Sequence, residues 1–414
     1  MNYIYVLSGW IFLLIGLAIS IALHELGHLL PAKKFGVKVT KYMVGFGPTV
    51  FSRKRGETEY GIKLIPLGGY IQMIGMVPPL DKDAKQTAWR RLTNSVTQSE
   101  EPTPEDDARA FYRLAPWKKL IVMFGGPFAN LLIATVLSLA LFSGFGGYDR
   151  NNVVHQVVAC IPSDANPNCA QVSNLSPASL AGLKAGDKII SFAGHSITRW
   201  SEIDPLLAKS VGKTESIVVN RNGQSIPLEI KVTNFTFAGQ TRPFVGVYLE
   251  SQRYQQTPTQ ALGNLGSMLA GTGEMILQLP AQAVNAVAEI APGSARNPNG
   301  AISIIGLGQY SGDLASSNTM AFEDKILSQL AMILSLNIAL FVFNMLPLVP
   351  LDGGHIAGAL YESVKRGIWR LRGKNLEKPV ATAMMMPIAY IVASMMFVLT
   401  IILVLRDVIN PLHL

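Results

Sequence analysis

Residues 21–28 read IALHELGH and end the first of four long uncharged stretches in this chain. They contain the pattern H-E-x-x-H, with His24 and His28 four residues apart and Glu25 next to His24. Residues four apart on a helix lie on one face, with Cβ atoms about 5–6 Å apart. Two imidazoles at this spacing can bind one metal ion and leave the carboxylate free to act as a base. The alternative is that these polar side chains simply end a helix at an interface.

The uncharged stretches predict a membrane protein. They cover residues 1–23, 120–148, 326–351 and 379–405. Each can supply the roughly 20 residues that cross about 30 Å of hydrocarbon. Only 15% of the 414 residues are charged, whereas soluble domains usually have about 25%. We therefore predict a polytopic α-helical membrane protein with four transmembrane helices. The first stretch lacks the basic start and small-residue cleavage site of a signal peptide.

The distribution of charge predicts the orientation of these helices. Residues 33–119 contain 16 Lys and Arg against 9 Asp and Glu, and residues 355–378 contain 6 against 2. Residues 147–324 contain 11 against 13. Because basic residues stay in the cytoplasm, we expect both termini and residues 147–324 to be extracytoplasmic. The net charge of +8 then reflects topology, and no nucleic-acid partner is expected, since that needs a clustered basic face.

A third metal ligand is expected at the end of the third stretch. Catalytic zinc uses three protein ligands and keeps a fourth position for water. Asp352 follows the uncharged residues 326–351, and Pro347 and Pro350 break the helix that leads to it. His24 and Asp352 can then both lie in the cytoplasmic half of the bilayer. The alternative is that Asp352 only terminates a helix.

Three motifs resemble those of the site-2 protease family of intramembrane zinc metalloproteases. They are His24 to His28, the sequence Gly126-Pro127-Phe128-Ala129-Asn130, and the stretch from Asn344 to Gly354. The resemblance covers essentially the whole chain. It is closest to the bacterial branch that cleaves anti-sigma factors in the plasma membrane, in its actinobacterial form with one PDZ domain. Many bacterial relatives have a second proline where this chain has Val349, which affects the backbone path and not the ligand.

The resemblance implies roles for individual residues. It implies a Zn²⁺ cofactor held by His24, His28 and Asp352. Glu25 would be the general base that takes a proton from water and passes it to the leaving amine. Asn344 would donate a hydrogen bond to the scissile carbonyl or its oxyanion, and Asn130 would steady the site or the substrate backbone. For both asparagines the alternative is a polar contact between helices.

Residues 42–75 predict a β-hairpin, because two apolar stretches with Gly and Pro flank a charged turn. The resemblance implies a membrane-re-entrant β loop that offers a strand edge to an extended substrate. The alternative is an ordinary cytoplasmic hairpin. Four glycines in this segment are interpreted as backbone devices at or near the substrate: Gly45, Gly47, Gly68 and Gly69.

Residues 147–250 predict one extracytoplasmic α+β domain. Asn222-Gly223 between two apolar runs is a strong hairpin signal. The region resembles a PDZ domain, which binds peptide C-termini by strand addition. It could instead exclude bulky substrates or only stabilise the protein. Cys160 and Cys169 lie here, and an oxidising compartment permits a disulfide between them; two unpaired thiols are the alternative.

The predicted boundaries divide the chain into eight segments. These are transmembrane helix 1 (1–30), a cytoplasmic segment with the hairpin (31–117), transmembrane helix 2 (118–146), the PDZ-like domain (147–250), an extracytoplasmic amphipathic region (251–324), transmembrane helix 3 (325–354), a cytoplasmic loop (355–378) and transmembrane helix 4 (379–406).

The favoured function is an intramembrane zinc endopeptidase that cleaves single-pass membrane proteins, such as anti-sigma factors, within the lipid bilayer. One alternative is a metal-binding membrane transporter or scaffold without hydrolytic activity. Another is a PDZ-type membrane adaptor, which leaves the membrane-embedded His and Asp residues unexplained. Glu25 separates the first two hypotheses, because a hydrolase needs this carboxylate and a transporter does not.

Overall fold

The computed structural model describes residues 3–76, 104–160, 175–237, 240–291, 294, 297, 300–318, 320–373 and 386–411. The chain forms two compact units. The first comprises Met1–Leu141, Gln260–Ser294 and Pro298–Leu414, and the second comprises Phe142–Thr259 and Ala295–Asn297.

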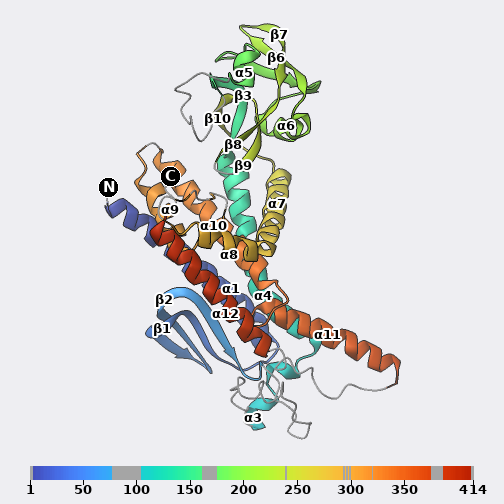
Figure 1. Cartoon of the computed structure of the whole chain (residues 1–414). Helices are drawn as coiled ribbons and strands as arrows, with labels where there is room; N and C mark the ends of the chain where they lie inside the picture. The colour runs from blue at the N-terminus through green and yellow to red at the C-terminus, as the bar shows by residue number, and fades with distance from the viewer. Residues whose placement is uncertain are drawn as a thin grey trace. The chain divides into compact units, whose positions relative to one another are not determined.

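Four long apolar helices dominate the first unit (Figure 1). They are α1 (Tyr3–Lys34), α4 (Pro116–Ser138), α10 (Phe322–Asn344) and α12 (Met386–Ile409). The helix of α4 continues as the π-helical segment η2 (Leu139–Gly146). Among the described residues, four helical segments are long and apolar enough to cross a membrane, with mean hydropathies of 2.1–2.7. This confirms the prediction of a polytopic α-helical membrane protein.

Helices α1 and α4 cross at glycines. A Cβ atom added to Gly27 would overlap the Gly125 carbonyl, and one added to Gly125 would overlap the Gly27 carbonyl. Small residues allow membrane helices to approach at backbone distance. The crossing therefore brings the second histidine of the H-E-x-x-H motif directly against α4.

The third long helix ends earlier than the sequence boundary at residue 354. Helix α10 ends at Asn344, residues 345–351 leave the helix, and α11 (Asp352–Leu371) begins a new one. Prolines in the break cannot donate backbone hydrogen bonds, which explains the interruption. Most of the expected loop 355–378 is therefore helical. Buried Glu362 of α11 pairs with buried Lys119 of α4 at 2.7 Å, which fixes α11 on α4.

The β structure predicted for residues 42–75 is present as β1 (Val39–Arg55) and β2 (Thr58–Met73). The two bent strands are antiparallel and pair twice, so that Tyr42 faces both Tyr60 and Ile71. The start of β1 thus lies between the two ends of β2. The Tyr42 hydroxyl donates to the Ala22 carbonyl at 2.7 Å and ties the sheet to α1.

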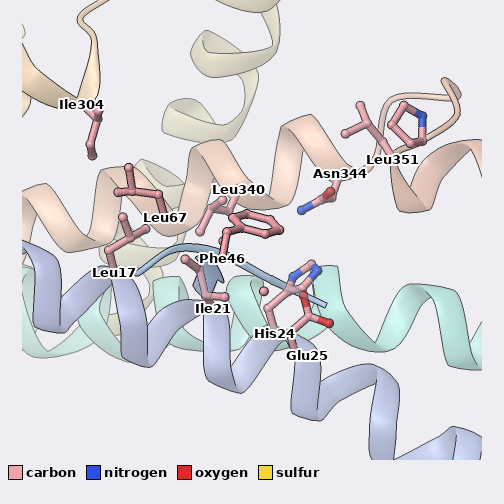
Figure 2. A pocket seen from close by; sticks show the side chains of 13 residues that line it. Leu17, Ile21, His24, Glu25, Phe46, Leu67, Ile304, Leu340, Asn344 and Leu351 are labelled. Carbon is pink, nitrogen blue, oxygen red and sulfur yellow. The ribbon is translucent and has the colours of Figure 1, made fainter. Parts of the chain in front are cut away.

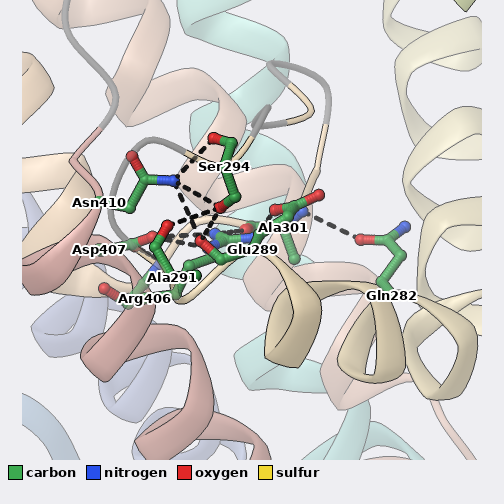
Figure 3. A network of polar contacts seen from close by, with 9 residues as sticks. Gln282, Glu289, Ala291, Ser294, Ala301, Arg406, Asp407 and Asn410 are labelled. Atoms are coloured by element: carbon green, nitrogen blue, oxygen red, sulfur yellow. Dashed lines mark hydrogen bonds and ion pairs between the residues drawn. The ribbon is translucent and has the colours of Figure 1, made fainter. Parts of the chain in front are cut away.

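The described part of the first unit has four further α-helices: α3 (Pro104–Asp107), α7 (Pro258–Leu277), α8 (Leu279–Ala288) and α9 (Ile304–Ser316). Of these, α8 and α9 contact α12. Buried Asp407 of α12 accepts from the backbone N–H of Ser303 at 2.7 Å. Its neighbour Arg406 pairs with Glu289 at 3.1 Å, and the Asn410 amide donates to Ser294 (Figure 3). This polar network ties the end of α12 to the segment between α8 and α9.

The second unit is rich in β structure. Its six-stranded sheet has the order β10-β3-β4-β6-β7, with β5 paired to β4. The strands are β3 (Gly147–Val157), β4 (Lys188–Phe192), β5 (His195–Ser196), β6 (Thr214–Arg221), β7 (Gln224–Lys231) and β10 (Val247–Tyr254), with β8 (Thr233–Phe237) and β9 (Gln240–Phe244) as a separate pair. Two short helices accompany them, α5 (Pro177–Leu180) and α6 (Asp204–Ser210).

The hairpin predicted at Asn222-Gly223 is confirmed. Both residues have positive φ, at 54° and 86°, and they join β6 to β7. A two-residue turn with this backbone matches the twist of paired strands. Cys160 is buried and disulfide-bonded. Its expected partner Cys169 lies outside the described residues, so the pairing stays a prediction.

Candidate metal centre

Three predicted ligands come together at the junction of α1 and the start of α11. The Nε2 atoms of His24 and His28 lie 3.2 Å apart. The Oδ2 atom of Asp352 lies 3.3 Å from each of them. Among the described residues, this is the group of His, Cys, Asp and Glu side chains whose ligand atoms converge within 4.8 Å.

This triangle fits a zinc ion. Zinc bonds to His nitrogen and carboxylate oxygen are about 2.0–2.2 Å long, and a tetrahedron of that size has edges of about 3.3–3.6 Å. The three observed separations match such edges closely. Oδ2 of Asp352 is also buried and has no hydrogen-bond partner among the described residues. An orphaned buried carboxylate oxygen is costly unless a cation or a donor satisfies it, and the two facing Nε2 atoms fit a shared cation.

Each imidazole has a hydrogen-bond partner behind it. Nδ1 of His28 lies 2.7 Å from the Val122 carbonyl of α4. Nδ1 of His24 lies 2.6 Å from Oδ1 of Asn130, also on α4. A ring nitrogen that donates to an oxygen leaves the opposite nitrogen with a lone pair for a metal. Asn130 therefore sits behind a ligand and not on the cavity wall.

Glu25 and Asn344 line one cavity of about 770 Å³ together with His24 (Figure 2). Glu25 is buried, and the backbone N–H of Ile71 in β2 hydrogen-bonds to its carboxylate. The rest of the wall is mostly apolar: Leu17, Ile21, Phe46, Leu67, Gly68, Gly69, Ile304, Leu340, Pro350 and Leu351. The Glu25 carboxylate therefore borders a largely apolar space with few polar groups.

The hairpin glycines occupy different places. Gly69 lies against Glu25, because an added Cβ would lie 3.0 Å from Cγ of that residue. Gly68 has a φ of 155° and lies beside Phe46. Gly45 and Gly47 also have positive φ and flank Phe46 at the bend of β1, but they are not themselves among the residues that line the cavity. The structure thus brings Gly68 and Gly69 to the cavity and leaves the other two as turn positions.

The sequence profile of peptidase family M50 matches residues 12–388. The chain belongs to peptidase family M50. It is similar to the zinc metalloprotease Rip1 of Mycolicibacterium smegmatis, with 30% identity over 98% of both chains. It is 29% identical to zinc metalloprotease Rip1 of Mycobacterium tuberculosis H37Rv and of Mycobacterium bovis BCG, again over 98% of both chains.

Membership of the M50 family, which is the site-2 protease family, confirms the resemblance inferred from the motifs. The protein is a zinc metalloprotease of the intramembrane type. Four apolar helices make it a multi-pass membrane protein, so its substrates are membrane proteins within the bilayer.

Proposed function

We propose that this M50 peptidase hydrolyses peptide bonds of single-pass membrane proteins in the cytoplasmic half of the bilayer, with His24, His28 and Asp352 as its zinc ligands. The observation that carries the proposal is the triangle of ligand atoms, with edges of 3.2–3.3 Å, beside the Glu25 carboxylate. A transporter or scaffold that binds zinc without hydrolysis would need the three ligand atoms but not the Glu25 carboxylate at the cavity wall.

The side chains around the cavity divide the chemical work. Zinc, when bound, supplies Lewis acidity and lowers the pKa of water. Glu25 takes the proton of the attacking water and delivers it to the leaving amine. The Asn344 side-chain amide donates to the scissile carbonyl oxygen as negative charge develops on it. The apolar wall excludes bulk water, which strengthens both interactions.

An extended substrate segment would bind along the end of β2. Residues 69–72 pair with residues 41–44 on one side, and Gly69 abuts Glu25 on the way to the cavity. A helical substrate hides its peptide bonds, whereas an unwound segment can add to a strand edge by backbone hydrogen bonds. The second edge of residues 69–72 is therefore the proposed docking edge.

Exposed apolar side chains support a re-entrant position for the bend of the sheet. They gather at the bend of both strands and include Phe46, Val50, Phe51, Ile62, Leu64, Ile65 and Leu67. The other end of the hairpin is charged, at Arg53, Lys54, Arg55, Glu57 and Glu59. An apolar patch of this kind is unfavourable in water and is satisfied by lipid. We therefore favour the re-entrant loop over an ordinary cytoplasmic hairpin.

The proposed topology keeps both termini and the second unit outside the cytoplasm. The disulfide at Cys160 supports an oxidising compartment for that unit. The unit would act as a PDZ-like module that binds a peptide C-terminus or filters substrates by size. Membrane-embedded anti-sigma factors are the proposed substrate class, as the bacterial branch of the family suggests.

Substitution of Glu25 tests the proposal. The full-length protein is reconstituted in liposomes with a single-pass anti-sigma factor, and zinc content and cleavage are measured together. We expect Glu25→Gln to keep one zinc per chain and to lose about 10²–10⁴-fold in cleavage rate. The control is Glu323→Gln, in the first turn of α10, which should cleave like the wild type. Cleavage by Glu25→Gln at the wild-type rate would reject the mechanism.

A further inference from the structure

A chain of buried hydrogen bonds runs behind His24 through three helices. Asn130 on α4 has two hydrogen-bonded neighbours. Its Oδ1 lies 2.6 Å from Nδ1 of His24, and its Nδ2 donates to Oδ1 of Asn337 at 3.2 Å. Nδ2 of Asn337 on α10 donates to the Ile333 carbonyl at 2.8 Å and to Ser20 of α1 at 2.9 Å. Both asparagines are fully buried.

The direction of this chain is fixed at the Ile333 end. A backbone carbonyl only accepts hydrogen bonds, so Asn337 must present its NH₂ group to Ile333. Its Oδ1 then faces Asn130, which must answer with its own NH₂ group. Oδ1 of Asn130 is thereby turned to His24, whose Nδ1 must carry the proton. The lone pair is left on Nε2, the atom that faces Asp352 at 3.3 Å.

We infer that Asn337 is a positioning residue of the metal centre: acting through Asn130, it sets the tautomer and ring orientation of His24. The inference rests on the proposed zinc ligation and adds a residue to it. Asn337 does not line the active-site cavity among the described wall residues, so it has no access to substrate. Hydrogen-bond partners behind metal ligands commonly tune affinity in this way.

A purely structural role for Asn337 makes a different prediction, and Ser311 provides the control. Ser311 on α9 is also fully buried and joins helices, since its hydroxyl lies 2.8 Å from the Gly9 carbonyl and 2.7 Å from Gln329. Its hydrogen bonds reach no metal ligand. Loss of either residue should lower stability, but only loss of Asn337 should alter metal binding.

The first test compares metal binding of Asn337→Leu, Ser311→Ala and wild type as full-length protein in nanodiscs. Co²⁺ replaces Zn²⁺, and its affinity is measured by competition with a chelator, together with its visible absorption spectrum. We expect Asn337→Leu to bind about 10–100-fold more weakly with an altered spectrum, and Ser311→Ala to match wild type. Unchanged affinity and spectrum in Asn337→Leu would overturn the inference. A wild type that binds no metal would instead contradict the proposed function.

A double-mutant cycle tests the route through Asn130. In Asn130→Asp the carboxylate accepts from His24 in either orientation but cannot donate to Oδ1 of Asn337, so the orientation of His24 no longer depends on Asn337. Asn337→Leu should therefore weaken Co²⁺ binding by less than about threefold in this background, since coupled neighbours are not additive. An equal loss in both backgrounds would contradict the relay.

The third test needs no substitution of Asn130 or Asn337. The metal-free protein labelled with ¹⁵N-histidine is examined by solid-state NMR, and the His24 signals are assigned from their absence in His24→Asn. We expect a protonated Nδ1 and an unprotonated Nε2 for the neutral ring of His24. A proton on Nε2 would overturn the inference even if Asn337→Leu does not fold.

Discussion

The two histidines of the H-E-x-x-H motif are supported in different ways. His28 is held by a single contact with the backbone, the Val122 carbonyl of α4 at 2.7 Å. His24 is held by a side chain, Asn130, which depends on another side chain, Asn337. A backbone carbonyl is present whatever residue supplies it, so the first support depends on how closely two helices approach. The second support depends on residue identity and is open to loss by one substitution.

The largest expected effect comes from separating α1 and α4 at the His28 support. A Cβ added to Gly126 would overlap Nε2 of His28, so Gly126→Ala should displace this ring. We expect loss of stoichiometric zinc, measured by metal analysis. The rate of substrate cleavage should fall by more than the about 100-fold that follows the loss of a hydrogen-bond partner behind a metal ligand.

Gly367→Ala provides the matched control for this substitution. Gly367 lies in α11 with nothing within 4 Å of an added Cβ, and alanine favours helix over glycine. We expect full zinc content and unchanged cleavage. Retention of zinc by Gly126→Ala would mean that His28 does not depend on the helix crossing.

The next effect concerns the support of Asp352, the third proposed ligand. Glu362 and Lys119 form a buried ion pair at 2.7 Å that fixes α11, the helix that begins with Asp352. Removing one partner leaves a buried charge and should cost about 3–5 kcal/mol. We expect Glu362→Gln to lower the free energy of unfolding in mixed micelles by this amount and to weaken zinc binding.

Replacing both Lys119 and Glu362 shows whether the loss of stability in Glu362→Gln comes from the unpaired buried charge. The double variant Lys119→Met with Glu362→Leu removes both buried charges of this pair and leaves Arg366, the partly exposed second partner of Glu362 at 2.7 Å, to solvent; apolar replacement of a buried pair is often neutral. It should recover most of the lost stability. If Glu362→Gln is as stable as wild type, α11 is held by its other contacts with α4.

The smallest expected effect on the metal centre comes from the second unit. Asp187 is buried there and accepts from Nε and an NH₂ group of Arg221, each at 2.7 Å. Burial raises the pKa of the Asp187 carboxyl most strongly, but the hydrogen bonds of Arg221 and of the Lys184 backbone N–H, together with both positive charges, outweigh it and hold the pKa below its usual value. The pair therefore stabilises the fold above about pH 4, and this contribution is lost as the pH falls through the lowered pKa.

Arg221→Met should weaken this dependence on pH, because the Lys184 backbone N–H still donates to the Asp187 carboxylate at 2.8 Å. We expect hydrogen–deuterium exchange of residues 175–254 in the variant to be faster at neutral pH and to change less on acidification than in wild type. Zinc content at neutral pH should stay the same. A loss of zinc would show that the second unit also supports the metal centre.

Parts of the site could be predicted from the sequence because their signals are local. His24, Glu25 and Asp352 are ionisable residues at the ends of uncharged stretches, where such groups are costly and usually functional. The Val122 carbonyl could not be predicted, since every residue offers one. Asn337 did offer a signal, as an amide within the uncharged residues 326–351, but its partner could be identified only once three helices were assembled.

The fold was predictable to a similar degree. Length and composition were sufficient for the four long helices. The double pairing of Tyr42 with Tyr60 and Ile71 was not predictable. The alternation of apolar and polar residues predicts a strand, but it does not determine which residues the strand pairs with. Helix α11 was interpreted as a loop because its polar face interrupts the apolar pattern, and its stability depends in part on the distant Lys119.

The interruption between α10 and α11 allows the cavity wall at Asn344 to move independently of Asp352. Asn344 ends one helix and Asp352 begins the next, and α11 is anchored to α4 by Lys119 and Glu362. A tilt of the last two turns of α10 about Asn337, which is bonded to Asn130 and Ser20, would carry Asn344 outward and widen the cavity, while the Asp352 carboxylate stayed where α4 holds it. The enzyme could thus admit a bulky transmembrane segment without dismantling its catalytic ion site.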